Sequence, residues 1–225
     1  MEGSLPSQFG MLSQLTHLVA FDNRMSGTIP TELFVMENLT LVMLNDNMIS
    51  GGLSSEIASW SGLESLMLDT NVITGKLPSN IGVLTSLQSL HLHSNMFSGA
   101  PPSELGLLTA LTELFVGHNH ISGNLPTSLG QLTALGQLRL GSNSISGILP
   151  SELGLMGMFL WELDLTANNL SQTIPTELGA LLNLRSLDLS FNSLTGPIPS
   201  ELANLPDTGQ ILFRGNGMTG VLPLE

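Results

Sequence analysis

Apolar and polar positions along the chain repeat with a period of 24 residues, with one step of 25. Each unit carries a segment in which leucine-like residues alternate with variable ones before an asparagine, as in LMLDTN and LDLTAN. Alternation with period two predicts a short strand whose leucines point inward, so stacked units form one parallel sheet. Nine asparagines mark the units: Asn23, Asn47, Asn71, Asn95, Asn119, Asn143, Asn168, Asn192 and Asn216.

The segment after each asparagine carries turn and helix signals. Most units place a glycine four residues later, as at Gly27, where it supplies a positive φ; one unit has Gln172 instead. A proline three residues further on favours an extended exit. The Ser/Thr-Glu-Leu-Gly motif that follows, as at residues 103–106 and 176–179, predicts a short helical turn. Its hydroxyl residue is expected to be the N-cap, with the glutamate near the positive helix end.

These signals predict a right-handed, curved α/β solenoid, with a parallel sheet on the concave side and short helical or 3₁₀ segments on the convex side. Residues 1–225 form a single predicted domain of about nine 24-residue units. Both ends are expected to be cut within a repeat, because Gly3 and Pro6 match Gly27 and Pro30 in phase and Pro223 has the same phase at the other end. The asparagine column is interpreted as structural, since its amides can satisfy buried backbone groups of each turn.

Composition narrows the classes of function. The chain has 5 Lys and Arg against 18 Asp and Glu, and its net charge of −13 argues against nucleic acid or an anionic membrane as a partner. Because there is no cysteine, disulfides, thiolate nucleophiles and cysteine-bound metals are excluded. No apolar run reaches the ~18 residues of a membrane span, so no membrane insertion is expected within this chain.

The pattern LxxLxLxxNxLxGxIPxxLGxL resembles the plant-type leucine-rich repeat of receptor-like kinase ectodomains and polygalacturonase-inhibiting proteins. The resemblance covers essentially the whole chain, although the cysteine-paired end caps usual in that family are absent. It implies recognition of a peptide or protein on the concave face and its margin. It also favours an extracellular or cell-surface location as part of a longer parent protein. The residues themselves indicate no compartment.

Recognition is read from the positions six, four and two residues before each asparagine, which face out of the sheet. In the first units these positions form an apolar group that water disfavours unless a partner covers it. The alternative is that aliphatic residues simply suit strands. The group comprises Val19, Phe21, Leu41, Met43 and Met67, and Phe115 extends it toward the middle units.

Histidines concentrate in the middle units, where His91 and His93 share a strand and His118 precedes Asn119. Because neighbouring strands lie ~4.8 Å apart, His93, His118 and Asp69 are able to converge. This arrangement raises a metal hypothesis, but its spacing matches no zinc motif. Histidines that lie on an ordinary surface or contact a ligand are the favoured interpretation, and no metal or cofactor is expected.

The later units present charged residues, namely Arg139, Glu162, Asp164 and Asp188. Asp164 and Asp188 occupy equivalent places in neighbouring strands, and like charges placed so destabilise a sheet unless a cation compensates them. One interpretation assigns that role to a basic group on a partner. The other assigns it to arginines of the chain itself: Arg139, Arg185 and Arg214.

The sequence therefore predicts a module that recognises a peptide or protein. The alternative is a metal- or glycan-binding protein that uses the concave histidines and acidic residues. No catalytic residues are assigned, because no Ser/His/Asp triad, phosphate loop or nucleotide fingerprint is present. Self-association is expected through uncapped ends, which expose the core residues Leu5, Phe9, Leu12, Ile211, Phe213 and Leu222.

Overall fold

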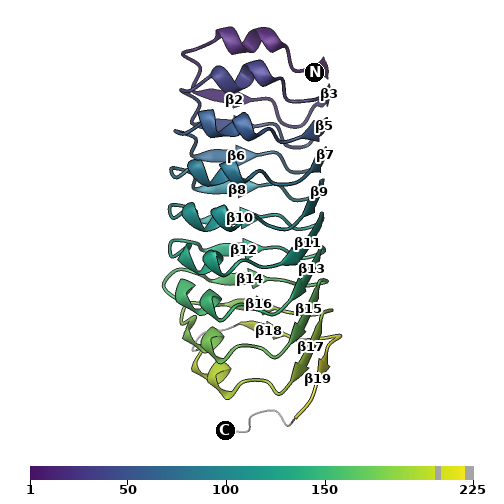
Figure 1. The fold of residues 1–225 in the computed structure, drawn as a ribbon, viewed down its shortest axis with the longest axis vertical. Helices are drawn as coiled ribbons and strands as arrows, with labels where there is room; N and C mark the ends of the chain where they lie inside the picture. Colours follow the sequence, from purple (N-terminus) through teal and green to yellow (C-terminus); the bar gives the residue numbers. More distant parts are fainter. Residues whose placement is uncertain (206–208, 221–225) are drawn as a thin grey trace.

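The computed structural model describes residues 1–205 and 209–220 as an elongated stack of repeated units (Figure 1). Within these residues, strands from successive units pair in parallel to form a nine-stranded sheet. Its outer surface is called the concave face below. The strands are β2 (His17–Val19), β4 (Leu41–Met43), β6 (Ser65–Met67), β8 (Ser89–His91), β10 (Glu113–Phe115), β12 (Gln137–Arg139), β14 (Glu162–Asp164), β16 (Ser186–Asp188) and β18 (Gln210–Leu212).

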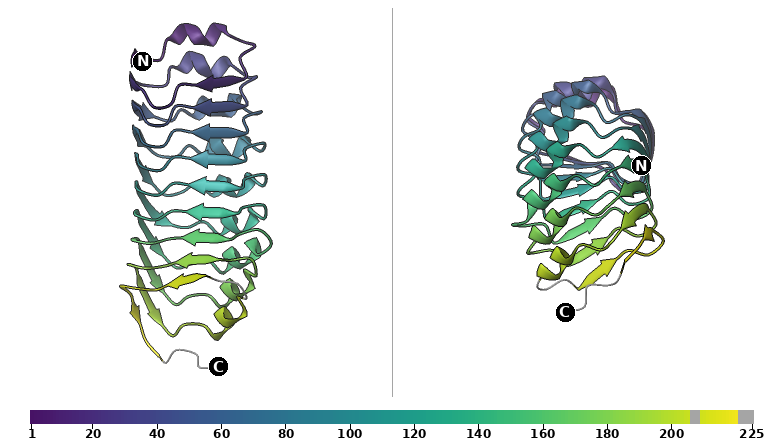
Figure 2. Two further views of the ribbon diagram at one scale, coloured as in Figure 1. Left: turned by 180° about the vertical axis from the view of Figure 1, so that it is seen from behind. Right: turned by 60° about the horizontal axis from the view of Figure 1, so that its bottom comes forward.

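A second parallel sheet, absent from the sequence-based prediction, runs beside the first along the length of the stack (Figure 2). Apart from β1, each of its described strands has a single inward apolar residue, such as Ile73, so the segment gives no alternating pattern to detect. Its ten strands in the described part are β1 (Glu2–Ser4), β3 (Arg24–Gly27), β5 (Met48–Gly52), β7 (Val72–Gly75), β9 (Met96–Gly99), β11 (His120–Asn124), β13 (Ser144–Gly147), β15 (Asn169–Gln172), β17 (Ser193–Gly196) and β19 (Gly217–Met218).

Short 3₁₀ helices complete the units, as expected for the convex side. None of the described helices has the length and apolar character that crossing a membrane requires. The helices are η1 (Ser7–Met11), η2 (Thr31–Val35), η3 (Ser55–Ser59), η4 (Ser79–Val83), η5 (Ser103–Leu107), η6 (Thr127–Gln131), η7 (Ser151–Met156), η8 (Thr176–Ala180) and η9 (Ser200–Asn204). The extra residue of the 25-residue unit coincides with η7, which is one residue longer than the others.

The predicted N-caps of these helices are wrong. The cap position is occupied by proline in η5 and η8, and the hydroxyl residue is the first helical residue. Its hydroxyl donates instead to the next glutamate, at 3.1 Å from Ser103 to Glu104. One described helix, η3, does have a side-chain cap. There Ser54 stands in place of proline, and its hydroxyl oxygen accepts the Glu56 N–H at 3.1 Å. Proline at the cap position sets the extended backbone that precedes the helix.

The core lies between the two sheets and the helices and consists mainly of stacked leucines. The leucines before each strand and within it, such as Leu111 and Leu114, are fully buried in the central units. Trp60 substitutes for a smaller residue in one unit; it is fully buried, and its indole N–H donates to the Leu33 carbonyl at 3.1 Å. Burial of such columns, at ~25 cal/mol per Å² of apolar surface, stabilises the stack.

The asparagine column is a buried hydrogen-bonded ladder, as predicted. The Asn119 amide group donates to the carbonyls of Val116 and Gly117 in its own turn, and to that of Leu92 in the preceding unit. Its oxygen accepts the Phe97 N–H at 2.9 Å. Each such asparagine therefore closes its own turn and links it to the unit before.

The loop glycines have positive φ, as predicted, for example 75° at Gly123. The unit with Gln172 keeps the same conformation, with φ of 69°, so a residue with a side chain is held in the left-handed region there. Residues directly before the marker asparagines share this region, including His118 with φ of 53°. This backbone turn carries the His118 side chain toward the concave face.

The two ends expose part of the core. Leu5 is buried, whereas Phe9, Ile211 and Phe213 are only partly covered and Leu12 is 48% exposed. The sixth residue of the predicted set, Leu222, lies outside the described residues. Self-association through these ends stays a prediction.

Candidate functional site

One row of outward side chains runs along the concave face. The strands pair in register, so each residue four positions before a marker asparagine lies beside its equivalent in the next unit. The row contains, in order, Val19, Met43, Met67, His91, Phe115, Arg139, Asp164 and Asp188. The other predicted residues flank it, in the strands or the following turns: Leu41, Glu162, Phe21, Asp69, His93 and His118.

The apolar group is contiguous. Register places Val19 beside Met43 and Met43 beside Met67. Val19 and Phe21 are 48% and 46% exposed, while the two methionines are half-buried. Adjacent, partly exposed apolar side chains form a surface that loses unfavourable hydration when a partner covers it.

Two of the middle histidines, His91 and His93, each contact a carboxylate. His91 Nε2 lies 2.9 Å from Glu113 Oε2, and the His91 ring stacks on Phe115 with centroids 4.3 Å apart. His93 Nε2 lies 3.5 Å from Asp69 Oδ2. Burial lowers the pKa of His93, against the effect of Asp69, and burial raises the pKa of Asp69. His93 is therefore neutral near pH 7 and serves as a polar wall rather than a cation.

The metal hypothesis finds no geometric support. In residues 1–205 and 209–220, no three His, Asp or Glu side chains come together in a way that could hold a metal ion. His93 and Asp69 do converge as expected, and His118 lines the same cavity as His93, but among the described residues no hydrogen bond or ion pair joins His118 to either of them. The Nδ1 atom of His93 is buried and has no hydrogen-bond partner.

Arg139 is engaged by Glu162. Its guanidinium donates two hydrogen bonds to that carboxylate, at 3.0 and 2.7 Å, and lies over the Phe115 ring at 4.6 Å from the centroid. Gln137 donates a further bond to Glu162 at 2.7 Å. Burial acts to raise the pKa of Glu162, but the donors from Arg139 and Gln137 outweigh it and lower the pKa. This carboxylate is therefore ionised and neutralised within the chain.

Asp164 and Asp188 are not neutralised in the same way. Asp164 Oδ1 accepts the Thr166 N–H at 2.9 Å, and Asp188 Oδ1 accepts the Ser190 N–H at 2.8 Å. Burial raises the pKa of Asp164, opposed by the Thr166 N–H and reinforced by the neighbouring Asp188. The two carboxylates lie in adjacent strands, register partners of each other.

The interpretation that arginines of the chain compensate this pair holds only in part. Arg139 makes its two hydrogen bonds to Glu162, although its charge also acts to lower the pKa of Asp164. Arg214 lies over the Phe191 ring at 5.3 Å. Among the described residues, no ion pair joins Asp164 or Asp188 to an arginine. Both carboxylates at this end of the concave face therefore have no ion-pair partner in the described part of the chain.

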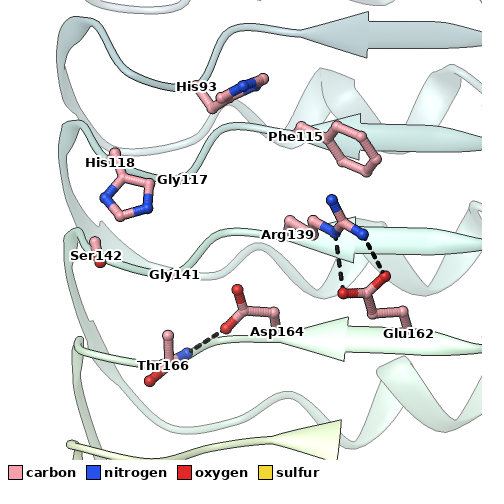
Figure 3. Close-up of a pocket in the computed structure, with 10 residues that line it drawn as sticks. All are labelled: His93, Phe115, Gly117, His118, Arg139, Gly141, Ser142, Glu162, Asp164 and Thr166. Carbon is pink, nitrogen blue, oxygen red and sulfur yellow. Dashed lines mark hydrogen bonds and ion pairs between the residues drawn. The ribbon is translucent and has the colours of Figure 1, made fainter. Parts of the chain in front are cut away.

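A cavity of about 380 Å³ opens between the histidines and Asp164 (Figure 3). It lies over the backbone of Gly117 and Gly141, which both stand two positions before a marker asparagine. The units before and after them have His93 and Thr166 at the equivalent position. A Cβ atom on Gly141 would come within 2.9 Å of both Asp164 carboxylate oxygens. The two missing side chains therefore produce the cavity. His118, Phe115, Arg139, Ser142 and Glu162 complete its lining.

Sequence reasoning missed Gly117, Gly141 and Glu113. The glycines were detectable, because two consecutive units have no side chain two positions before the asparagine, a position that faces outward in the other units. The contact of Glu113 with His91 was harder to predict from the sequence. It depends on strand register, which places Glu113 beside Ser89 in the same strand as His91.

Replacing Asp164 by asparagine is expected to raise the melting temperature at neutral pH. Because burial raises the pKa of Asp164 above its usual 3.8, the ionised carboxylate costs stability when folded. The asparagine oxygen can still accept the Thr166 N–H. The advantage of the variant should shrink as pH falls through the raised pKa and vanish below 3.8, where folded and unfolded wild type both bind the proton.

Thermal melts at a series of pH values test this expectation. Asp22→Asn removes the same charge from an exposed turn at the first unit and is the matched control. A variant that melts below wild type at neutral pH would show that Asp164 is stabilised, rather than penalised, by its surroundings.

The comparisons with known proteins agree with this fold. A model of the leucine-rich repeat matches residues 86–108, 110–132, 159–181 and 183–205. Among solved structures, the plant peptide hormone receptor RGFR1, in complex with RGF2, gives a TM-score of 0.94 at 34% identity over 96% of this chain. The Arabidopsis receptor kinase HAESA, in complex with the peptide hormone IDA and the co-receptor SERK1, gives 0.95 at 36% identity over 99%. A comparison with curated protein sequences gave no match.

These matches cover only part of the receptors, since the chain spans 35% of the RGFR1 chain and 37% of the HAESA chain. A plant ice-binding protein is also similar, with a TM-score of 0.86 and 25% identity over 99% of this chain and 71% of that one. The fold therefore supports several functions, and function has to be argued from exposed residues. The leucine-rich-repeat model thus matches four segments of the chain, the chain has the leucine-rich-repeat solenoid fold, and it is similar to the ectodomains of plant receptor kinases.

Proposed function

We propose that this chain binds a peptide, or an extended segment of a protein, along the row of outward side chains on its concave face. The observation that carries the proposal is the cavity over Gly117 and Gly141, because it opens directly beside this row at the centre of the sheet and is lined by Phe115, Arg139 and Asp164 of the row. A hollow flanked by aromatic, imidazole and carboxylate groups suits one side chain of a ligand.

The surface on either side of the cavity supports an elongated ligand. An apolar stretch runs from Val19 to Met67, and an acidic stretch contains Asp164 and Asp188. Adaptable methionine side chains favour contacts with a peptide. The similarity to RGFR1 and HAESA, whose structures contain peptide hormones, supports the same class of ligand. Because the family model finds leucine-rich repeats, recognition is favoured over catalysis.

The alternative of a metal- or glycan-binding protein has weaker support. This alternative depended on several histidines and acidic residues coming together at one point. In the structure His91 pairs with Glu113 and His93 pairs with Asp69. Among the described residues, no cluster fits a metal ion.

The double variant Met43→Ser and Met67→Ser is expected to weaken binding of a selected peptide about tenfold, because the ligand loses apolar contact area. The ligand is first obtained by panning a random peptide library against the immobilised protein. Titration calorimetry then compares the variants with wild type. The matched control replaces Met48 and Met96, which are 51% and 46% exposed on the second sheet, by serine.

Unchanged affinity in the Met43 and Met67 variant, with loss of affinity in the control, would place the ligand on the second sheet. Failure of every library peptide to bind would contradict the proposed function as a whole. Melting temperatures of both variants establish that any loss of binding does not come from unfolding.

A further inference from the structure

We propose that the cavity over Gly117 and Gly141 is a subsite for a basic group of the ligand, an ammonium or guanidinium ion, with Asp164 as its counter-ion. This inference rests on the proposed function and adds the chemistry of one position of the ligand. Three features of the cavity carry it: its shape, its charge balance and the groups on the rest of its wall.

The shape leaves Asp164 accessible from the cavity. Because residue 141 has no side chain, nothing separates the carboxylate from the hollow; a Cβ there would lie 2.9 Å from both oxygens. Figure 3 shows one Asp164 oxygen bonded to the Thr166 N–H and the other directed away from Thr166, toward β12. That second oxygen is available to a donor from a ligand.

The charge balance of the cavity is negative at neutral pH. Arg139 and Glu162 neutralise each other through two hydrogen bonds. His93 is held neutral by burial. Arg139 also attracts Asp164 through space, but among the described residues no ion pair reaches Asp164, and Glu162 and Asp188 add to the negative potential. In a protein with a net charge of −13, a cation is favoured over an anion here.

The rest of the wall offers no second cation site. The Thr166 methyl group lies toward residue 141, 2.8 Å from the place that a Cβ there would take, and the Thr166 hydroxyl donates to the Ser190 carbonyl in the next unit at 3.2 Å. The Phe115 ring already has His91 stacked on it and the Arg139 guanidinium over it. Asp164 is therefore the group on this wall that binds the charged end of a basic side chain.

Nuclear magnetic resonance with small cations tests the subsite without any peptide. Agmatine and butylamine are the probes, and succinate is the anionic control. Both cations are expected to shift the amide signals of Gly117, Gly141 and Thr166 and to saturate. Asp164→Asn should weaken this binding at least tenfold, because a charge-assisted hydrogen bond is lost while the Thr166 contact is retained. Asp22→Asn should leave it unchanged.

Binding of succinate in place of the cations would overturn the inference, as would equal binding of agmatine to wild type and Asp164→Asn. The selected peptides provide the second arm. Replacing their Lys or Arg by norleucine, or acetylating the N-terminus, distinguishes a side chain from a terminal amine as the bound group. If peptides bind the concave face and neither change weakens binding tenfold, the subsite is wrong and the proposed function stands.

Discussion

Asn119→Ala is expected to lower the free energy of unfolding by about 3 kcal/mol. The substitution leaves the Phe97 N–H without its acceptor and removes a donor from three carbonyls, two in its own turn and one in the preceding unit. Asn119 is only 7% exposed, so water replaces these bonds poorly. The loss therefore combines the desolvation of stranded backbone groups with a weakened link between units. Urea denaturation measures it.

Asn216→Ala is the control, because Asn216 makes the same set of bonds at a less buried position near the end of the array. Terminal units of a solenoid have one neighbour and open locally at lower cost than central ones. We expect a loss of about 1 kcal/mol there. Equal losses at the two positions would show that burial and neighbouring units do not determine the strength of the ladder.

The concave sheet was predictable from the sequence because its signal is redundant. The inward leucines, the asparagine and the glycine recur in nearly every unit, so one irregular unit does not obscure the pattern. Stacking then determines strand register, which is why residues 24 positions apart, such as Met43 and Met67, lie side by side. The replacement of the loop glycine by Gln172 was also detectable from the sequence. Glycines at the equivalent positions have positive φ, and Gln172 has it as well.

The second sheet and the helix starts were not predictable in the same way. The strands of the second sheet are held mainly by backbone pairing between units, which depends on tertiary stacking and not on a local pattern. At the helix starts, proline and the hydroxyl residue both fit an N-terminal position, and the sequence does not decide which precedes the first turn. The helix η3 is the one described helix with Ser54 instead of proline at this position, and there the serine side chain is the N-cap.

The candidate site was predicted as a set of side chains, but its cavity lies over two glycines, which have no side chain. Residue-by-residue reading favoured chemically active types such as His93 and Asp164 and passed over Gly117 and Gly141. Pairing among charged groups also depended on geometry. Strand register places Arg139 beside Asp164, and only the side-chain positions show that Glu162 takes both of the Arg139 hydrogen bonds.

Gly141→Leu is expected to reduce the affinity of a selected peptide more than tenfold while the chain remains folded. The new side chain occupies the cavity and displaces Asp164 and Thr166, whose ends would lie 2.8 to 2.9 Å from its Cβ. Gly141 does not have a positive φ, so the backbone accepts a side chain there. The conflict is thus confined to side-chain ends. Titration calorimetry and thermal melts measure both effects.

Ala100→Leu is the matched control, because it adds a comparable side chain at an exposed position outside the concave face. It should leave affinity unchanged. The comparison separates a role of the cavity from a general effect of added apolar surface. If Gly141→Leu binds the peptide as tightly as wild type, the ligand crosses the array without entering the hollow. Recognition would then depend on the apolar row from Val19 to Met67, whose methionine variant would still lose affinity.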